Sequence, residues 1–170
     1  MMRTPIRSIA VAGLLHVLGL SAGHADTIIR DDPGGILQKY DVKYRQIASR
    51  GEKVVIDGDC ASACTIILGI VPRENVCVTA RARLGFHLWQ YPLTAFMGKV
   101  IMVPLPEYRQ SELNYLYYDT KVRDWIQNHG PQTIEVSWME GPDLADVYPN
   151  CGDRMPLDEA DSVRVKPLRD

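Results

Sequence analysis

Ser62 and His87 are the residues whose types and positions best fit nucleophilic catalysis. Ser62 lies in the small-residue run 60–64, after an apolar stretch at 54–56 and a turn, so we expect it at a strand-to-helix junction. Backbone N–H groups and the helix dipole at such a junction favour negative charge on a reacting oxygen. The next expected strand, 76–79, leads on to His87, which can return beside Ser62 as its general base.

Both residues also have ordinary structural interpretations. A serine at the start of a helix often caps the first turn, and a single histidine is most often structural. The proposed pair therefore depends on the elements that position the two side chains.

Strand and helix patterns alternate along the first half of the chain, which indicates an α/β domain with a mainly parallel sheet. In such sheets ligands gather at the carboxyl ends of the strands. Ser62 and the Pro-Gly-Gly turn at 33–35 both fall at those ends, although the turn also fits an ordinary loop. The expected strands are 27–30, 54–56 and 76–79, and the expected helices are 36–49 and 61–70.

The second half of the chain has a less regular pattern. Residues 88–106 contain aromatics, prolines and one apolar run, and they fit a flap strand, the edge of a substrate groove, a subunit contact, or a long loop packed on the core. A helix is predicted over 106–128 and a shorter one over 132–139. Cys151 is expected to pin the polar tail to the body.

Residues 1–25 have the pattern of a secretory signal peptide, with Arg3 and Arg7 before an apolar run and small residues up to Ala25. The apolar run is too short to span a membrane. We therefore expect one α/β domain over residues 26–170, without a membrane span, in a secreted or periplasmic protein.

The chain carries 19 Lys and Arg against 21 Asp and Glu, and loss of the signal peptide increases the acidic excess, so no nucleic-acid partner is expected. No cofactor or metal is expected either. In an oxidising compartment Cys60, Cys64, Cys77 and Cys151 most simply form two disulfides. We expect all four to be oxidised, with at least one of Cys60 and Cys64 bonded to a distant cysteine. A zinc site is the alternative, but Cys60 and Cys64 lack the usual paired spacing.

Three motifs, Asp32-Pro33-Gly34-Gly35, Ala61-Ser62-Ala63 and Gly85-Phe86-His87, resemble the glycine turn, the nucleophile turn and the histidine strand of the proteolytic subunit of Clp-type serine proteases. The chain is similar above all to exported bacterial proteins that share this Clp/crotonase-like fold. The resemblance covers about residues 27–149 and implies repeated β-α units, truncated at the N-terminus relative to the family.

The resemblance also implies roles for five residues. Ser62 would be the nucleophile, His87 the general base and Asp143 the carboxylate that orients it, while the N–H groups of Gly35 and Ala63 would form the oxyanion hole. The implied function is an exported serine hydrolase, most simply a peptidase that acts on peptides or proteins. It would be independent of ATP, since no ATPase partner is expected outside the cytoplasm, and a homo-oligomer is compatible with the resemblance.

The third residue of the triad is the least well matched part. Residues 130–132 resemble the loop that precedes it, but a gapless count ends near Met139. Asp143 ranks first because a turn just past a helix end can aim a short carboxylate inward, and Asp146 and Glu140 are the alternatives.

Two other functions are weighed against the hydrolase. The enoyl-hydratase branch of this fold fits less well, because it holds a thioester with two backbone donors and uses no serine triad. A non-catalytic envelope protein that binds a peptide or another protein, through the same cleft or through residues 88–106, remains the alternative.

Overall fold

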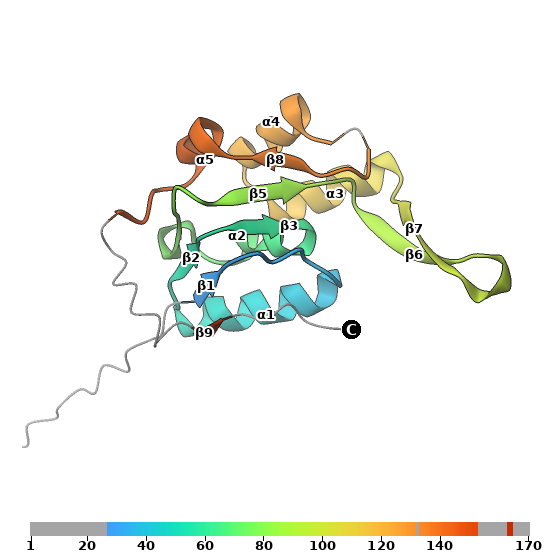
Figure 1. Ribbon diagram of the computed structural model, residues 1–170, viewed down its shortest axis with the longest axis horizontal. Coiled ribbons are helices and arrows are strands. Elements are labelled where there is room, and N and C mark those ends of the chain that lie inside the picture. The colour runs from blue at the N-terminus through green and yellow to red at the C-terminus, as the bar shows by residue number, and fades with distance from the viewer. Residues whose placement is uncertain (1–26, 132, 153–162, 165–170) are drawn as a thin grey trace, which may run out of the picture.

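Four short parallel strands form the larger sheet of the computed structural model, which describes residues 27–131, 133–152 and 163–164 (Figure 1). The strand order is β4-β2-β1-β9, and each neighbouring pair is parallel. The expected signal peptide lies outside the described residues. The strands are β1 (Thr27–Ile29), β2 (Val54–Ile56), β4 (Val76–Val78) and β9 (Val163–Arg164).

Apolar sequence and helical spacing explain how this sheet is covered. All three residues of β2 are buried, as expected for a central strand of a parallel sheet. Helix α1 (Leu37–Arg50) connects β1 to β2 and buries Tyr40, Tyr44 and Ile47. Gly51 ends α1 at a φ of 65°, a conformation that glycine adopts without a Cβ penalty. The predicted strand–helix–strand unit is therefore present.

A second, mixed sheet carries the candidate site. Its strands β3 and β5 are parallel, whereas β5 and β8 are antiparallel. The chain after β1 runs alongside β3, because Asp32 N donates to Asp59 O at 2.8 Å and Ala61 N donates to Asp32 O at 2.9 Å. The strands are β3 (Asp59–Ala61), β5 (Arg83–Phe86) and β8 (Ser137–Met139).

The helix predicted over 132–139 is wrong, because residues 137–139 form strand β8. Gly85 in β5 explains the pairing. A Cβ on Gly85 would lie 2.8 Å from Val136 Cγ1 and 2.9 Å from Trp138 Cζ3, so the missing side chain makes room for these two residues. Cross-strand packing thus outweighs the local helical pattern.

The helix predicted over 61–70 is present in two parts. The first is the 3₁₀ helix η1 (Ser62–Ile66), which is largely buried, and the second is α2 (Ile67–Ile70), which buries its first two residues. The short 3₁₀ helix η2 (Arg73–Asn75) then leads into β4.

The single helix predicted over 106–128 is instead two helices, α3 (Glu107–Tyr117) and α4 (Thr120–His129). Tyr118 and Asp119 between them have extended backbones. Asp119 caps α4, because its side chain accepts a hydrogen bond from the backbone N–H of the third residue of that helix. The break turns the Tyr118 side chain into the core, where it is 5 % exposed.

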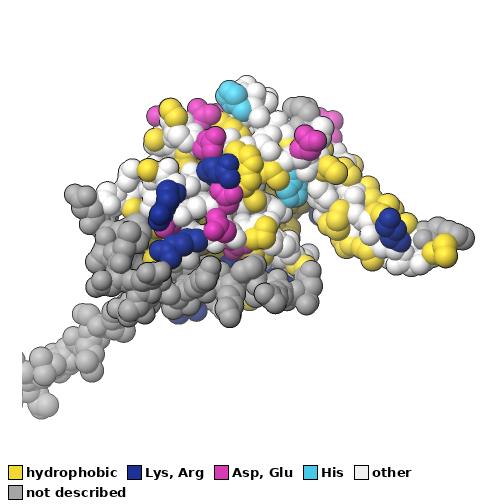
Figure 2. All heavy atoms as spheres, viewed as in Figure 1, with side chains coloured by type: hydrophobic (Ala, Val, Ile, Leu, Met, Phe, Trp, Pro, Cys, Tyr) yellow, Lys and Arg dark blue, Asp and Glu magenta, His cyan; other side chains and the backbone are white. Residues whose placement is uncertain are grey.

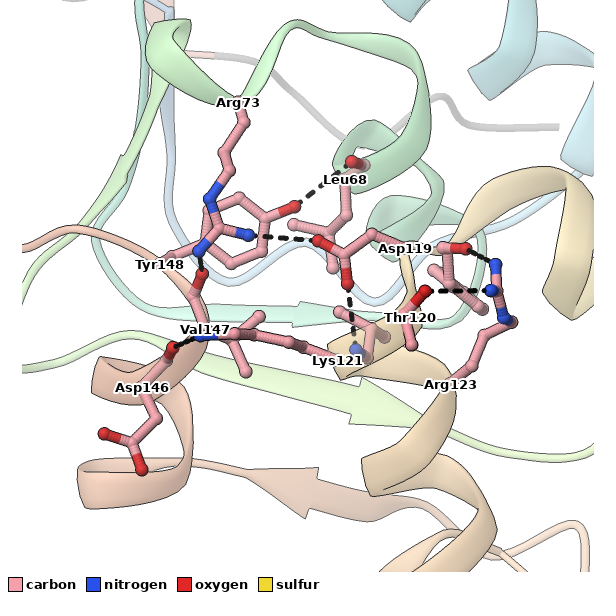
Figure 3. A network of polar contacts seen from close by, with 11 residues as sticks. Leu68, Arg73, Asp119, Thr120, Lys121, Arg123, Asp146, Val147 and Tyr148 are labelled. Carbon is pink, nitrogen blue, oxygen red and sulfur yellow. Dashed lines mark hydrogen bonds and ion pairs between the residues drawn. The ribbon is translucent and has the colours of Figure 1, made fainter.

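Arg73 ties this helix break to the end of α5 (Gly141–Val147), as Figure 3 shows. Its Nη1 donates to Asp119 Oδ2 at 3.0 Å, and its Nη2 donates to the Val147 carbonyl. The guanidinium also lies 4.9 Å from the centre of the Tyr148 ring. One side chain therefore joins η2, α4 and the end of α5.

Residues 90–104 form a hairpin that projects from the body (Figure 1), hereafter the arm. Strands β6 (Gln90–Thr94) and β7 (Val100–Pro104) are antiparallel and are connected through η3 (Phe96–Gly98). Most of the arm is exposed, Met97 at its tip to 90 %, and Figure 2 shows hydrophobic side chains along it. A long loop packed on the core is therefore excluded for this segment.

The tail after α5 runs beside β4. Cys151 is bonded to Cys77, Val78 N donates to Pro149 O at 3.0 Å, and Cys151 N donates to Val78 O at 2.9 Å. The prediction that Cys151 pins the tail to the body is confirmed.

Asp57, which follows β2, is a buried carboxylate among charged partners. Its side chain is 1 % exposed and accepts hydrogen bonds from Arg30, Thr79 and Arg81. Burial raises the pKa of Asp57, but the hydrogen bonds from these three residues outweigh burial and lower the pKa below its ordinary value. Acidic and basic side chains are intermixed on the face shown in Figure 2.

None of the helices within the described ranges combines the length and apolar character that a membrane crossing requires.

Candidate functional site

Ser62 lies at a sharp turn between β3 and η1. Its φ is 55°, in the left-handed region that a residue with a side chain rarely adopts. Such a conformation costs about 1–3 kcal/mol and persists only where the surrounding structure holds it. Its neighbours Ala61 and Ala63 are buried while Ser62 itself is partly exposed, so the turn presents its side chain at the surface.

A disulfide brackets this turn. Cys60 and Cys64 are bonded to each other, with Cα atoms 5.3 Å apart, and both are fully buried. The prediction that one of them pairs with a distant cysteine is therefore wrong. The tight turn at Ser62 returns Cys64 to Cys60, while the tail places Cys151 beside Cys77.

All four cysteines are nevertheless oxidised as expected, because no free cysteine is present in the described part of the chain. Two disulfides fit an exported protein, since such bonds persist in oxidising compartments.

The glycine turn packs directly against the Ser62 turn. Gly34 has a φ of 83°, and a Cβ there would lie 2.5 Å from Ala61 O, 2.7 Å from Ser62 Cβ and 2.8 Å from Ala63 N. Only glycine fits this contact without a shift of the backbone. The turn therefore lies beside the first N–H groups of η1, the region in which the oxyanion-hole donors Gly35 and Ala63 are predicted.

Asp32 anchors the glycine turn from inside the core. Its Oδ1 accepts hydrogen bonds from Gly34 N at 3.0 Å and from Tyr40 OH at 2.5 Å, and its Oδ2 lies 3.5 Å from Lys43 Nζ. Burial lowers the pKa of Lys43, and the charge of Asp32 opposes this effect. Burial and the bond to Asp32 raise the pKa of Tyr40, so its hydroxyl remains a donor. In the sequence, Asp32 stands out only as part of the turn motif.

His87 directly follows β5 and is partly exposed. Its Nδ1 lies 2.7 Å from the carbonyl oxygen of Leu88. Because a carbonyl oxygen only accepts, Nδ1 carries the proton, and Nε2 of the neutral ring is free to accept one. This is the tautomer that a general base requires.

Ser62 and His87 line one small pocket, with a cavity volume of about 50 Å³. The hydrogen bond of the His87 ring goes to Leu88 O, and none joins the ring to the Ser62 hydroxyl. General-base catalysis requires these two groups to come within hydrogen-bond reach. Aromatic and apolar residues form most of the remaining wall. The other lining residues are Thr65, Phe86, Leu88, Trp89, Gln110, Asn114, Tyr118, Ile126 and Pro131.

Thr65 connects the Ser62 turn to the pocket wall. Its hydroxyl donates to Ser62 O at 2.7 Å, so its oxygen accepts the proton of Tyr118 OH, also at 2.7 Å. Burial raises the pKa of Tyr118, which keeps the hydroxyl protonated as a donor. Neither residue was predicted from the sequence. The spacing of Ser62 and Thr65 within one helical turn is a signal for Thr65, but the sequence carries no comparable signal for Tyr118.

The three candidate carboxylates lie away from the pocket lining. Asp143, in the first turn of α5, accepts a hydrogen bond from Trp125 Nε1 at 2.8 Å. Glu140 Oε2 lies 3.9 Å from Arg83 Nε, and the Asp146 side chain is exposed. The structure thus places Ser62 and His87 on one pocket and does not bring these carboxylates to its lining. The role of Asp143 stays a prediction.

Within the described residues, no group of three or more His, Cys, Asp or Glu side chains is arranged to hold a metal ion. Comparison of the chain with protein-family models, with curated proteins and with solved structures finds no match.

Proposed function

We propose that this protein is an exported serine hydrolase, most simply an ATP-independent peptidase, on a Clp/crotonase-like fold. The observation that carries the proposal is the pocket that Ser62 and His87 share, with Ser62 in a positive-φ turn at the end of a strand. The contact between Gly34 and this turn supports it, because Gly34 lies against the backbone of Ala61 and Ala63 on either side of Ser62, and an oxyanion hole needs backbone N–H donors close to the nucleophile.

The proposed chemistry is acyl transfer to Ser62. His87 Nε2 accepts the Oγ proton as Oγ attacks the substrate carbonyl, and the N–H groups of Gly35 and Ala63 stabilise the oxyanion. Loss of one such donor typically costs about 2.7–4 kcal/mol of barrier. His87 then protonates the leaving group, and water, activated by the same nitrogen, releases the acyl group as an acid.

Covalent labelling with a fluorophosphonate probe tests this proposal. We expect the probe to label the wild-type protein, and we expect Ser62→Ala to abolish labelling and His87→Ala to slow it at least tenfold. Ser49→Ala, in an exposed position on α1, is the matched control and should label normally. Labelling that persists unchanged in Ser62→Ala would refute the assignment of the nucleophile.

For the third group of the site, the first-ranked carboxylate competes with a backbone carbonyl. Asp143 is the carboxylate that the resemblance implies, whereas the Leu88 carbonyl is the acceptor of the Nδ1 proton in this structure. A loss of about 10⁴-fold in turnover for Asp143→Asn would assign the role to Asp143, whereas a loss below tenfold would leave it with Leu88. Asp146→Asn and Glu140→Gln change the two alternative carboxylates and should change turnover little. A larger loss in either variant would assign the role to that residue instead.

A second candidate function is a non-catalytic envelope protein that binds a peptide or another protein. The arm favours it, because it carries several exposed large apolar side chains, and exposed apolar side chains that gather on one element often mark an interaction site. This function requires a partner in pull-down experiments that is retained by Ser62→Ala and lost when the arm is shortened. Failure to retain any partner would count against it.

A further inference from the structure

The pocket beside Ser62 is too small for a large acyl group. Its volume is about 50 Å³, whereas an apolar cavity of about 150 Å³ is of the size that holds benzene. A methyl or ethyl group fits in the smaller space, whereas an aromatic ring or a long alkyl chain would extend beyond it through the open side of the pocket.

Trp89 is the largest side chain in the pocket wall, and hydrogen bonds hold it in place. Its indole Nε1 donates to Asn114 Oδ1 at 2.7 Å. Its backbone N donates to Gln110 Oε1 at 2.7 Å, and Gln110 Nε2 donates back to Trp89 O at 2.8 Å. Rotation of the indole away from the pocket would break the bond to Asn114, so the pocket does not widen easily.

Neighbouring rings restrict Trp89 further. The ring centres of Tyr117 and Tyr118 lie 6.0 and 6.2 Å from that of Trp89. Tyr118 is itself fixed by its hydrogen bond with Thr65, which in turn bonds to the Ser62 carbonyl. The wall that limits the pocket and the turn that carries the nucleophile therefore form one connected structure.

We infer that the site acts on esters or amides of a small acyl group, with about two to three carbons or a glycine- or alanine-like residue on the acyl side, and that Trp89 sets this limit. The inference rests on the proposed serine hydrolase. The Ser62 Oγ–carbon bond forms as its proton moves to His87. The bond to the leaving group breaks as that proton is delivered, and water then hydrolyses the acyl-enzyme.

A series of p-nitrophenyl esters measures the limit directly. For the wild-type protein we expect kcat/KM to fall at least tenfold from the acetate ester to the octanoate ester. One extra or missing methylene in an apolar pocket typically changes kcat/KM by about 10–200-fold. Trp89→Ala should shift the preference toward butyrate or octanoate. Trp138→Ala, which changes a tryptophan in β8 outside the pocket lining, is the control and should keep the wild-type order.

The outcomes separate this inference from the proposed function. Wild-type protein that is labelled at Ser62 by the fluorophosphonate, but hydrolyses the octanoate as fast as the acetate, would overturn the small-acyl limit alone. Absence of both labelling and hydrolysis would overturn the hydrolase and the limit together. If folded Trp89→Ala hydrolyses the ester series with the same order of preference as wild type, Trp89 does not set the limit on acyl size. If that variant does not fold, Ile126→Ala enlarges another wall of the pocket and should shift the order in the same direction.

Discussion

Removing the two disulfides one at a time should separate stability from reactivity. Cys77 and Cys151 are 74 residues apart in the chain, whereas Cys60 and Cys64 are 4 apart. In the chain-entropy description, the stabilisation grows with the length of the closed loop, which gives about 4.5 kcal/mol for the long loop and about 2 kcal/mol for the short one. Cys77→Ala/Cys151→Ala should therefore lose roughly twice as much unfolding free energy as Cys60→Ala/Cys64→Ala.

Reactivity of Ser62 should change in the opposite order. The short disulfide closes the turn that holds Ser62 in a strained conformation with a φ of 55°. If the turn relaxes without this bond, an increase of about 1.4 kcal/mol in the barrier to reaction at Ser62 corresponds to a tenfold lower rate. We expect the fluorophosphonate to label Cys60→Ala/Cys64→Ala at least tenfold more slowly than wild type. The rate for Cys77→Ala/Cys151→Ala should stay within about twofold, because that bond pins the tail to β4.

Urea unfolding followed by circular dichroism measures the first quantity, and labelling of folded protein well below the unfolding transition measures the second. Equal labelling rates for the two double variants would refute the positioning role of the Cys60–Cys64 bond. A smaller loss of stability from removing the 74-residue link than from removing the short one would refute the loop-length argument.

Three further predictions concern packing, charge and the hydrogen bonds behind Ser62. Gly34→Ala should cost at least about 2 kcal/mol in urea unfolding, since its Cβ would lie 2.5 Å from a backbone oxygen, whereas Gly51→Ala, also at positive φ but in open space, should cost about 1 kcal/mol. Asp57→Asn should cost about 3 kcal/mol at neutral pH. Folding lowers the pKa of Asp57, so the stability difference between wild type and Asp57→Asn should be greatest above the unfolded pKa of about 3.9 and should shrink as the pH falls through the pKa of the folded state. A stability difference that does not depend on pH would contradict this prediction. Tyr118→Phe should cost about 1 kcal/mol and slow labelling of Ser62, and unchanged labelling would show that its bond to Thr65 does not position the nucleophile.

The strong periodic signals in the sequence predicted the parallel sheet and its first crossover helix. The continuous apolar run 54–56 is β2, and the helical spacing over 36–49 corresponds to α1 within a residue at each end. These elements are predictable because burial of their own apolar residues decides their structure. Strand β8 was not predicted, because its pairing depends on tertiary packing: Gly85, which has no side chain, leaves room for Val136 and Trp138.

The break between α3 and α4 shows a different limit. Apolar residues continue across the break, so periodicity alone predicts one helix. The local signal is Asp119, whose carboxylate caps α4, and the tertiary reason is the buried Tyr118 side chain between the two helices. A capping residue inside a helical pattern therefore indicates a helix boundary even where the hydrophobic pattern continues.

The candidate site was predictable where side chains form it and unpredictable where backbone groups form it. Ser62 and His87 are chemically distinctive residues in recognisable turns, and the structure places them on one pocket. The partner of His87 Nδ1 is the carbonyl of Leu88, a group that every residue carries and that no sequence motif marks. The sequence pointed to Asp143 because a carboxylate side chain can be identified from the sequence, whereas a backbone carbonyl with this role cannot. If the Leu88 carbonyl alone fixes the tautomer, it orients the ring but supplies no negative charge to stabilise the imidazolium. Such a site should turn over more slowly than a full triad and should change little in Asp143→Asn.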